Sequence, residues 1–292
     1  MPNNIALFKQ YIGGVLDEVY KNASLTSVLD GASELVREGA NANELVIPKM
    51  QMDGLADYSR NGGYVNGDVT LTYESVSCNF DRGRMFQVDS MDDIETAGVA
   101  FGRLAGEFIR TKVVPELDAF RFAAYAGVSG ISTVAAADLA TGAAVIAAIS
   151  AAADGMDDDE VPQSERYLFI TPTLYGLVRD MDTTKSKEVL AQFAGVVKVP
   201  QGRFYTAIDQ LDGKTSGEEA GGYAKATGAK NINFMIVHKP AVIQFEKHVV
   251  PKIITPEQNQ DADAWKFGYR NVSIADAYDN KVSGIYLHKA TT

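Results

Sequence analysis

Two parts of the chain carry apolar residues at three- and four-residue steps, which is the spacing of one face of an α-helix. The first part is residues 1–40, where the stripe consists of Ile5, Phe8, Ile12, Val15, Leu16 and Val19. A second short amphipathic stretch follows over residues 25–36. We expect a helical arm here, packed either on its own domain or on another subunit.

The strongest helical pattern spans residues 90–126. Its apolar face consists of Ile94, Ala97, Phe101, Leu104, Ala105, Phe108 and Ile109. Ser90 and Asp93 resemble a capping box at its start, and Pro115 predicts a kink or a restarted turn because proline has no N–H. A helix of about 35 residues would be roughly 50 Å long, so we expect a spine helix. Both phenylalanines of its apolar face should be buried under a sheet formed partly by residues 241–292.

Residues 44–89 change to strand patterns with turn formers between them. Residues 44–50 predict a strand, in which Pro48 indicates an edge or a bulge, and the stretch 53–68 is rich in Gly, Asn and Asp. The apolar positions that then alternate with polar ones are Val69, Leu71 and Tyr73. A hairpin with so few large apolar residues is not stable alone in water. We therefore expect something outside the local sequence to hold it.

Residues 135–240 predict a separate α/β layer, and residues 241–292 are again rich in strands. An alanine-rich helix is expected over 139–153, followed by an acidic turn at 157–160. Thr171 should cap a helix that begins at a first-turn proline. The expected strands are 167–170, 195–206, 232–237, 242–245, 249–254, 265–274 and 282–287, with a polar Gly-rich loop over 213–222. This order of elements indicates an α+β fold.

Composition narrows the class of protein. The 292 residues favour about two domains, and with 46% hydrophobic and 22% charged residues the chain is an ordinary globular one. A net charge of −11 gives no global electrostatic footprint for nucleic acid or for anionic membranes. A single cysteine, Cys78, allows no internal disulfide, and no signal peptide or membrane span is recognisable, so we expect a cytosolic product.

The residues offer no catalytic, cofactor or metal site. Gly213-Lys214-Thr215 resembles the end of a phosphate-binding loop, but the required earlier glycine is Ile208, which favours a solvent loop. The three histidines, His238, His248 and His288, lack metal-ligand spacing and are expected to be structural. The acidic run at 157–160 lacks the alternation of a calcium loop. Nothing in the sequence indicates an enzyme.

Several segments resemble the major capsid protein of tailed double-stranded DNA phages, which has the Hong Kong 97 capsid fold. The most specific is the spacing Asp81-Arg82-Gly83-Arg84, Phe86, Val88-Asp89 and Met91-Asp92 before a long helix. The other matching segments are 52–58, 64–74, 95–98, 108–118, 238–242 and 283–286. The resemblance covers essentially the whole chain.

The resemblance implies a domain organisation. Residues 1–43 would be an N-terminal arm, 44–89 an extended hairpin loop, 90–134 with 241–292 a peripheral domain with the spine helix, and 135–240 an axial domain. In the family the hairpin lies across a neighbouring subunit, which explains why it lacks support in its own sequence. The residues we expect at the subunit interface are Tyr58, Arg60, Val69, Leu71, Tyr73, Arg82 and Arg84.

The resemblance also implies assembly partners and a cellular location. Copies of the chain would form hexamers and pentamers of an icosahedral shell, assembled in the bacterial cytoplasm and becoming the virion capsid. The roughly 40 residues ahead of the hairpin are too few for a fused scaffolding domain of about 100 residues, which predicts a separate scaffolding protein besides portal and head-completion proteins. Double-stranded DNA would be enclosed without specific binding, which an acidic wall favours. No partner marks Lys49 for the covalent crosslink of some members.

Two other readings compete with the phage shell. One is a bacterial encapsulin on the same fold, against which the Asp81–Arg84 region argues. The other is an unrecognised cytosolic α/β enzyme, which would run as a small oligomer rather than as capsomers or shells.

Overall fold

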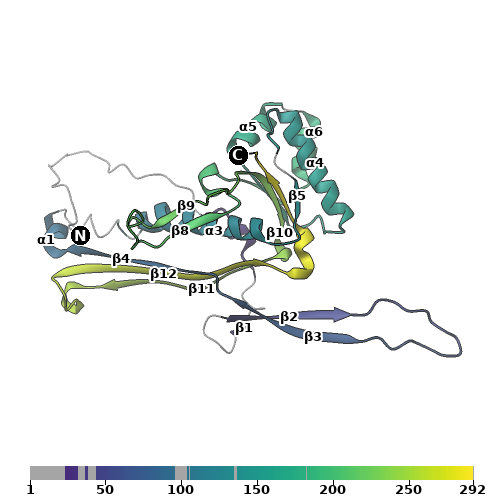
Figure 1. The fold of residues 1–292 in the computed structure, drawn as a ribbon, viewed down its shortest axis with the longest axis horizontal. Coiled ribbons are helices and arrows are strands. Elements are labelled where there is room, and N and C mark those ends of the chain that lie inside the picture. The colour runs from purple at the N-terminus through teal and green to yellow at the C-terminus, as the bar shows by residue number, and fades with distance from the viewer. Residues whose placement is uncertain are drawn as a thin grey trace.

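The computed structural model describes residues 24–31, 37–38, 44–95, 104, 106–134, 137–181 and 183–291. Four sheets organise this part of the chain: one of five strands, two of three strands and one of two strands. Figure 1 shows the five-stranded sheet with its helices at one end of a long three-stranded sheet, and the other three-stranded sheet projecting as a hairpin. The expected arm, residues 1–23, lies outside the described residues, and residues 25–36 are described only to Gly31, with one 3₁₀ turn, η1 (Ser27–Leu29).

The five-stranded sheet forms the core of the helical end. Its strands, in spatial order, are β5 (Ser132–Val134), β13 (Ile285–Lys289), β10 (Ile232–His238), β6 (Arg166–Ile170) and β7 (Gly195–Lys198). One face packs on α4 (Gly142–Asp158), α5 (Pro172–Met181) and α6 (Thr184–Ala191), and the other on α3 (Val114–Gly127). Because both faces are covered, the central strands are almost continuously apolar rather than alternating.

Three expectations in this part differ from the structure. The strand expected over 195–206 ends as β7 at Lys198, and a 3₁₀ turn, η4 (Gln201–Arg203), follows it. The acidic run at 157–160 is not wholly a turn, because α4 continues to Asp158 before Glu160 takes a φ of 56°. The last strand, β13, begins at Ile285 and lies in the five-stranded sheet, between β10 and β5. The alanine-rich helix and the buried strand at 167–170 are confirmed, with the N-cap of α4 supplied by Thr141.

The long sheet consists of β11 (Val242–Ile254), β12 (Ala264–Ala277) and β4 (Phe80–Asp89), all antiparallel, with β12 in the centre. The range 44–89 expected for one hairpin therefore contains two pairings, because β4 pairs with β12 while β2 (Glu44–Met52) pairs with β3 (Val69–Ser77). Alternation places Phe80, Phe86 and Val88 of β4 on one face. This face can be buried only against another element. Phe108 and Phe120, before and within α3, contact the rings of Phe86 and Phe80.

Of the expected spine helix, α1 (Ser90–Glu95), Leu104 and residues 106–108 are helical, whereas residues 96–103 and 105 lie outside the described residues. A π-helical turn over Ile109–Val113 leads directly into α3, with Pro115 in its first turn. Since proline cannot donate to the preceding turn, a break in the regular hydrogen-bond ladder is expected at this point. The Phe108 ring contacts Phe86, at 4.7 Å between centroids, so its place under the sheet is confirmed, although it is only half-buried. Phe101 lies outside the described residues.

Candidate assembly surface

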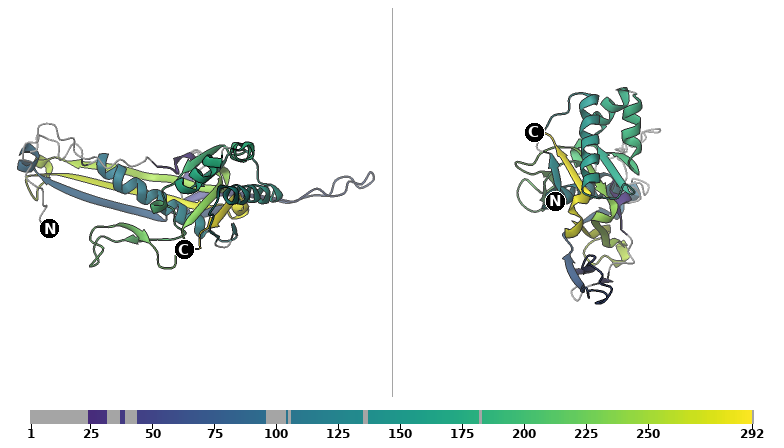
Figure 2. Two further views of the ribbon diagram at one scale, coloured as in Figure 1. Left: turned by 90° about the horizontal axis from the view of Figure 1, so that it is seen from above. Right: turned by 90° about the vertical axis from the view of Figure 1, so that its right-hand side faces the viewer.

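The β2–β3 hairpin projects from the body of the molecule, as Figure 1 and the left view of Figure 2 show. Its nine residue pairs run from Glu44–Ser77 to Met52–Val69, and β1 (Arg37–Glu38) adds a short third strand beside Leu45 and Val46. Beyond this short strand, the edge of β2 at Pro48 pairs with no described strand on that side. Pro48 therefore stands at an edge, as its missing N–H predicts.

Large apolar side chains are exposed along the outer half of this hairpin. The set consists of Met52, Leu55, Tyr58, Tyr64, Val65, Val69 and Leu71, each at least half exposed. Single exposed apolar residues are common, but a group of seven on one projecting element indicates a surface made for contact.

The tip of the hairpin has a defined local structure despite its exposure. The Tyr58 and Tyr64 rings lie 4.9 Å apart between centroids, and the backbones of Ser59 and Gly63 pair with each other. At the base of the tip, the Asp53 carboxylate accepts the Asp68 N–H at 2.9 Å. These short-range contacts shape the tip without burying it, so its apolar rings stay available to a partner.

The structure divides the seven expected interface residues into two groups. Tyr58, Arg60, Val69 and Leu71 are exposed on the hairpin. Tyr73 lies on β3 with its backbone opposite Pro48. Arg82 and Arg84 lie elsewhere, on β4, and their guanidinium groups contact other segments of the same chain.

Those contacts are made to a second, smaller hairpin, β8 (Ile208–Leu211) and β9 (Gly222–Lys225). Arg82 donates to the carbonyl oxygens of Leu211 and Gly222, at 2.7 and 3.1 Å, and to the Glu116 carboxylate at 2.8 Å. Arg84 donates to two further carbonyl oxygens in the loop between these strands. Desolvation raises the pKa of Glu116, and the Arg82 charge opposes that rise.

A buried ionic cluster under the spine was not predicted. Asp118 of α3 is fully buried and accepts hydrogen bonds from Arg203, at 2.9 Å, and from the Thr26 hydroxyl at 2.8 Å. One turn further along α3, Arg121 donates to the same Thr26 hydroxyl and to Glu246 of β11. The cluster fastens residues 24–31 to the spine. Its only sequence signal is the pair of charges three residues apart on an otherwise apolar helix face.

In the loop that resembles a phosphate-binding motif, the backbone N–H groups are bound by a carboxylate of the loop itself rather than left open for a phosphate. Asp212 accepts the backbone N–H groups of Lys214 and Thr215, at 2.7 and 2.8 Å. The hydrogen bonds from Thr215 and then Lys214 lower the pKa of Asp212 to about 2. Because this carboxylate occupies the donors that a phosphate would need, the interpretation as a solvent loop is supported.

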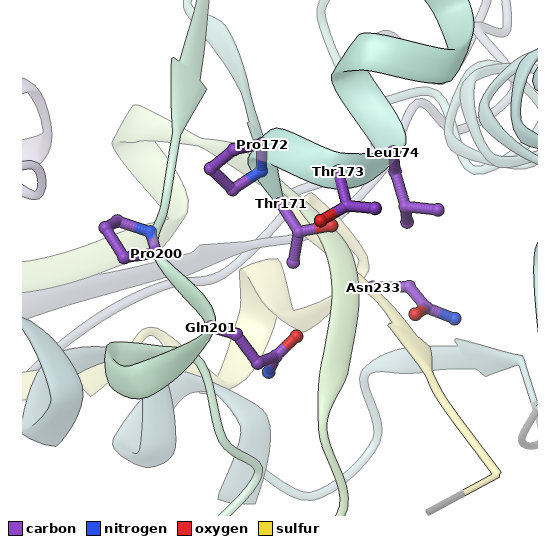
Figure 3. Close-up of a pocket in the computed structure, with 7 residues that line it drawn as sticks. All are labelled: Thr171, Pro172, Thr173, Leu174, Pro200, Gln201 and Asn233. Atoms are coloured by element: carbon purple, nitrogen blue, oxygen red, sulfur yellow. The ribbon is translucent and has the colours of Figure 1, made fainter.

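Among the described residues, no three His, Cys, Asp or Glu side chains are grouped to hold a metal ion. His238 and His288 are buried, and burial lowers the pKa of both. A pocket of about 420 Å³ at the carboxyl ends of β6 and β7 is lined by Thr171, Pro172, Thr173, Leu174, Pro200, Gln201 and Asn233 (Figure 3). None of these side chains can exchange a proton near neutral pH.

No helix within the described ranges combines the length and the apolar character that crossing a bilayer requires.

The sequence matches no protein-family model, and a search of the curated proteins found no match. Solved structures do match. A chain of Mycobacterium phage Che8 is 13% identical with a TM-score of 0.62, and 98% of each chain is covered. A chain in the capsid of Cyanophage P-SCSP1u is 14% identical with the same TM-score, over 98% of this chain and 94% of that one. A chain in the virus-like particle from Pyrococcus furiosus is 10% identical with a TM-score of 0.53, over 90% and 97%. The chain therefore has the Hong Kong 97-type capsid fold.

Proposed function

We propose that this protein is the major capsid protein of a tailed double-stranded DNA bacteriophage, which assembles into hexamers and pentamers of an icosahedral shell around the genome. The proposal assigns it no reaction, cofactor or metal. The observation that carries it is the projecting β2–β3 hairpin, with seven exposed large apolar side chains, on a chain of capsid fold. An element of this kind is costly to leave in water and is explained by a partner that covers it.

The partner we propose is a neighbouring copy of the same chain. A projecting hairpin and the surface that receives it are different patches, so the contact is head to tail, and such contacts close into rings when the rotation allows. Each subunit then both gives and receives one hairpin. On the hairpin we assign the contact to Tyr58, Arg60, Val69, Leu71 and Tyr73.

The acidic charge supports enclosure of DNA without tight binding. At −11 per subunit, a shell wall repels phosphates at long range, and any association should be weak and salt-sensitive. A separate scaffolding protein, a portal and head-completion proteins would then be needed to build and fill the head.

A second candidate is a nanocompartment shell that encloses protein cargo. The likeness to the virus-like particle from Pyrococcus furiosus favours it. Electron microscopy of particles purified after expression with the neighbouring genes separates the two. DNA-filled tailed heads support the phage capsid, and protein-filled shells support the nanocompartment.

Replacing residues 50–70 with a Gly-Ser linker tests the shell function itself. Since these residues lie outside the three apolar clusters of the described residues, the variant should melt cooperatively by circular dichroism yet form no shells by sedimentation and electron microscopy. A matched variant keeps the hairpin length and changes only Leu55, Tyr58, Tyr64 and Val65 to Ser. Loss of shells in both variants assigns the defect to the apolar contact, whereas intact shells from the deletion variant would refute the proposal.

A further inference from the structure

A pocket opens at the carboxyl ends of the parallel strands β6 and β7, where α5 begins. In open α/β sheets, ligands bind outside the carboxyl ends of neighbouring strands, and the order β6–α5–α6–β7 creates this geometry here. At about 420 Å³ the pocket has the size of a small-molecule site. The side chains that line it are uncharged, so its chemistry depends on where its hydrogen-bond donors and acceptors lie.

The N-terminus of α5 leaves two backbone donors beside this pocket. Pro172 holds the first position of the helix and has no N–H, and the first helical hydrogen bond runs from the Tyr175 N–H to the Thr171 carbonyl oxygen at 3.0 Å. The N–H groups of Thr173 and Leu174, which lie between them, donate to no described acceptor. Free N–H groups at the positive end of a helix dipole favour an anion.

Thr171 adds a buried hydroxyl that the chain itself does not use. The residue is only 5% exposed and lines the pocket, yet its hydroxyl forms no hydrogen bond with a described residue. A threonine before a helix ordinarily caps it through this hydroxyl, as the sequence predicts for Thr171, but the capping bond is not formed. Because a buried polar group without a partner is costly, the hydroxyl indicates a ligand in the pocket.

The opposite wall of the pocket presents an acceptor. Gln201 of η4 donates its Nε2 to the Phe204 carbonyl oxygen at 2.8 Å, which fixes the amide and leaves Oε1 without a described donor. Figure 3 shows this side chain extending across the pocket towards Thr171. A fully deprotonated oxyanion has no proton to donate to Oε1. A hydrogen phosphate group has both acceptor oxygens and a P–O–H donor, so it matches both walls.

One cation lies at the same end of the sheet. Lys198 pairs with Ile170, the residue before Thr171. Its ammonium group lies 5.4 Å from the centre of the Tyr175 ring, in the first turn of α5. None of the seven residues that line the pocket carries a carboxylate. The surroundings therefore favour an anion, although the whole chain has a net charge of −11.

We propose that this pocket binds a hydrogen phosphate group, either as inorganic phosphate or as a phosphate monoester. The phosphate oxygens accept from the N–H groups of Thr173 and Leu174 and from the Thr171 hydroxyl, and the P–O–H donates to Gln201 Oε1. The apolar part of the lining receives the organic part of a monoester. This is a binding site and not a catalytic one, and it does not depend on the proposed shell function.

Hydrogen exchange of the full-length chain tests the proposal with inorganic phosphate, glycerol 3-phosphate and sulfate at equal ionic strength. The measurement is made at about pH 6, where half of the phosphoryl groups of a monoester keep one proton. Phosphate should slow exchange of the Thr173 and Leu174 amides. Sulfate should need an at least about 10-fold higher concentration, because it has no proton for Oε1. Tighter binding of glycerol 3-phosphate than of phosphate identifies a monoester as the ligand, and weaker binding identifies inorganic phosphate.

Thr171→Val keeps the shape of the side chain and removes only the hydroxyl. It should weaken phosphate binding at least about 10-fold, the effect of one hydrogen bond to a charged group. The melting temperature without phosphate should not fall, because the hydroxyl bonds to nothing in the chain. Lys198→Gln should weaken binding by about 2- to 5-fold, as for an exposed charge. Lys225→Gln is the matched control and should change nothing, since its ammonium group also lies over a tyrosine ring, at 5.6 Å, but on β9.

If Thr171→Val fails to fold, Gln201→Glu carries the test, because it sets a carboxylate against the anion and should abolish the protection. Phosphate protection that survives either substitution would overturn the inference. Equal protection by sulfate, or protection spread over the whole chain, would also overturn it, since that is the general effect of salts excluded from the protein surface. A lower melting temperature of Thr171→Val without phosphate would assign the hydroxyl to the helix instead of to a ligand.

Discussion

Two of the long antiparallel pairs of strands, β11–β12 and β2–β3, differ in how far their apolar side chains are buried. In the pair β11–β12, the side chains of Phe267 and Tyr269 are 1% and 8% exposed. In the pair β2–β3, Val69 and Leu71 are 68% and 50% exposed. One strand of each pair, β12 and β3, alternates apolar positions with polar or small ones, so the difference does not come from strand geometry.

The difference comes from a third layer. β12 has β4 beside it and the spine above it, where Phe108 lies 6.5 and 6.2 Å from the rings of Phe267 and Tyr269. The outer half of β2–β3 has no such layer among the described elements. Burial by its own chain makes the first pair part of the core, and the lack of such burial leaves the outer half of the second pair exposed, where the proposed shell contact would cover it. Four substitutions test this contrast.

The largest effect should come from the covered pair. Phe267→Ala removes a fully buried ring from between the sheet and the spine, so the free energy of unfolding should fall by about 3–5 kcal/mol. Thermal and urea unfolding of the isolated subunit measure it. A loss below about 1 kcal/mol would mean that the spine does not cover β12 as described.

Asp118→Ala should cost at least about 3 kcal/mol, because it leaves the buried Arg203 guanidinium without its carboxylate. Asp180→Ala is the control, since its ion pair with Arg179 is exposed at 70% and 72%, and exposed pairs contribute about 0–1 kcal/mol. Urea unfolding compares the two variants. Equal losses would show that the cluster under the spine is no more buried than the surface pair.

Acid should destabilise the covered core through its histidines. Burial lowers the pKa of His288 below its ordinary value, so the folded state disfavours the proton that the unfolded state accepts. The stability contributed by neutral His288 is complete above a pH of about 6.5 and is lost as the pH falls towards the lowered value. His288→Gln should therefore flatten the loss of stability between about pH 6.5 and 5. An unchanged pH profile would assign the acid effect to other groups, such as His238.

The smallest effect on the subunit should come from the uncovered pair. Leu71→Ala removes a side chain that is half exposed, and unfolding should change by no more than about 0.5 kcal/mol. The same variant should nevertheless lower the yield of shells, because the lost contact belongs to the assembly. A large loss of subunit stability would show that the hairpin packs on its own chain.

Much of the local structure could be predicted from the sequence. The turn formers of residues 53–68 and the alternation after them indicated the hairpin, and the three- and four-residue steps after Ser90 indicated the spine. Pro115 marked the place where the spine changes its hydrogen bonding. These features depend on residues close together in the chain, whose periodicity and backbone preferences act before any tertiary contact forms.

Which elements these segments pack against could not be predicted from the sequence in the same way. Alternation along β4 is compatible with pairing to β3 or to β12, and only the spine above β12 decides between them. The sequence is equally compatible with Arg82 and Arg84 contacting a neighbouring subunit or contacting their own chain. Asp118 and Arg121 look like surface charges on a helix until residues 24–31, Arg203 and β11 converge on them.

The sequence by itself determined the alanine-rich helix α4 and the β2–β3 hairpin, together with the hairpin's lack of enough apolar residues to stand alone. It did not reveal the β8–β9 hairpin or the pairing of β4 with β12. The tertiary structure alone decided which apolar faces the chain covers for itself and which it leaves open. The physical reason is that burial belongs to pairs of surfaces far apart in the sequence, and no local pattern specifies the second surface. In this protein that distinction separates the β11–β12 pair, which completes the subunit, from the β2–β3 hairpin, which remains exposed.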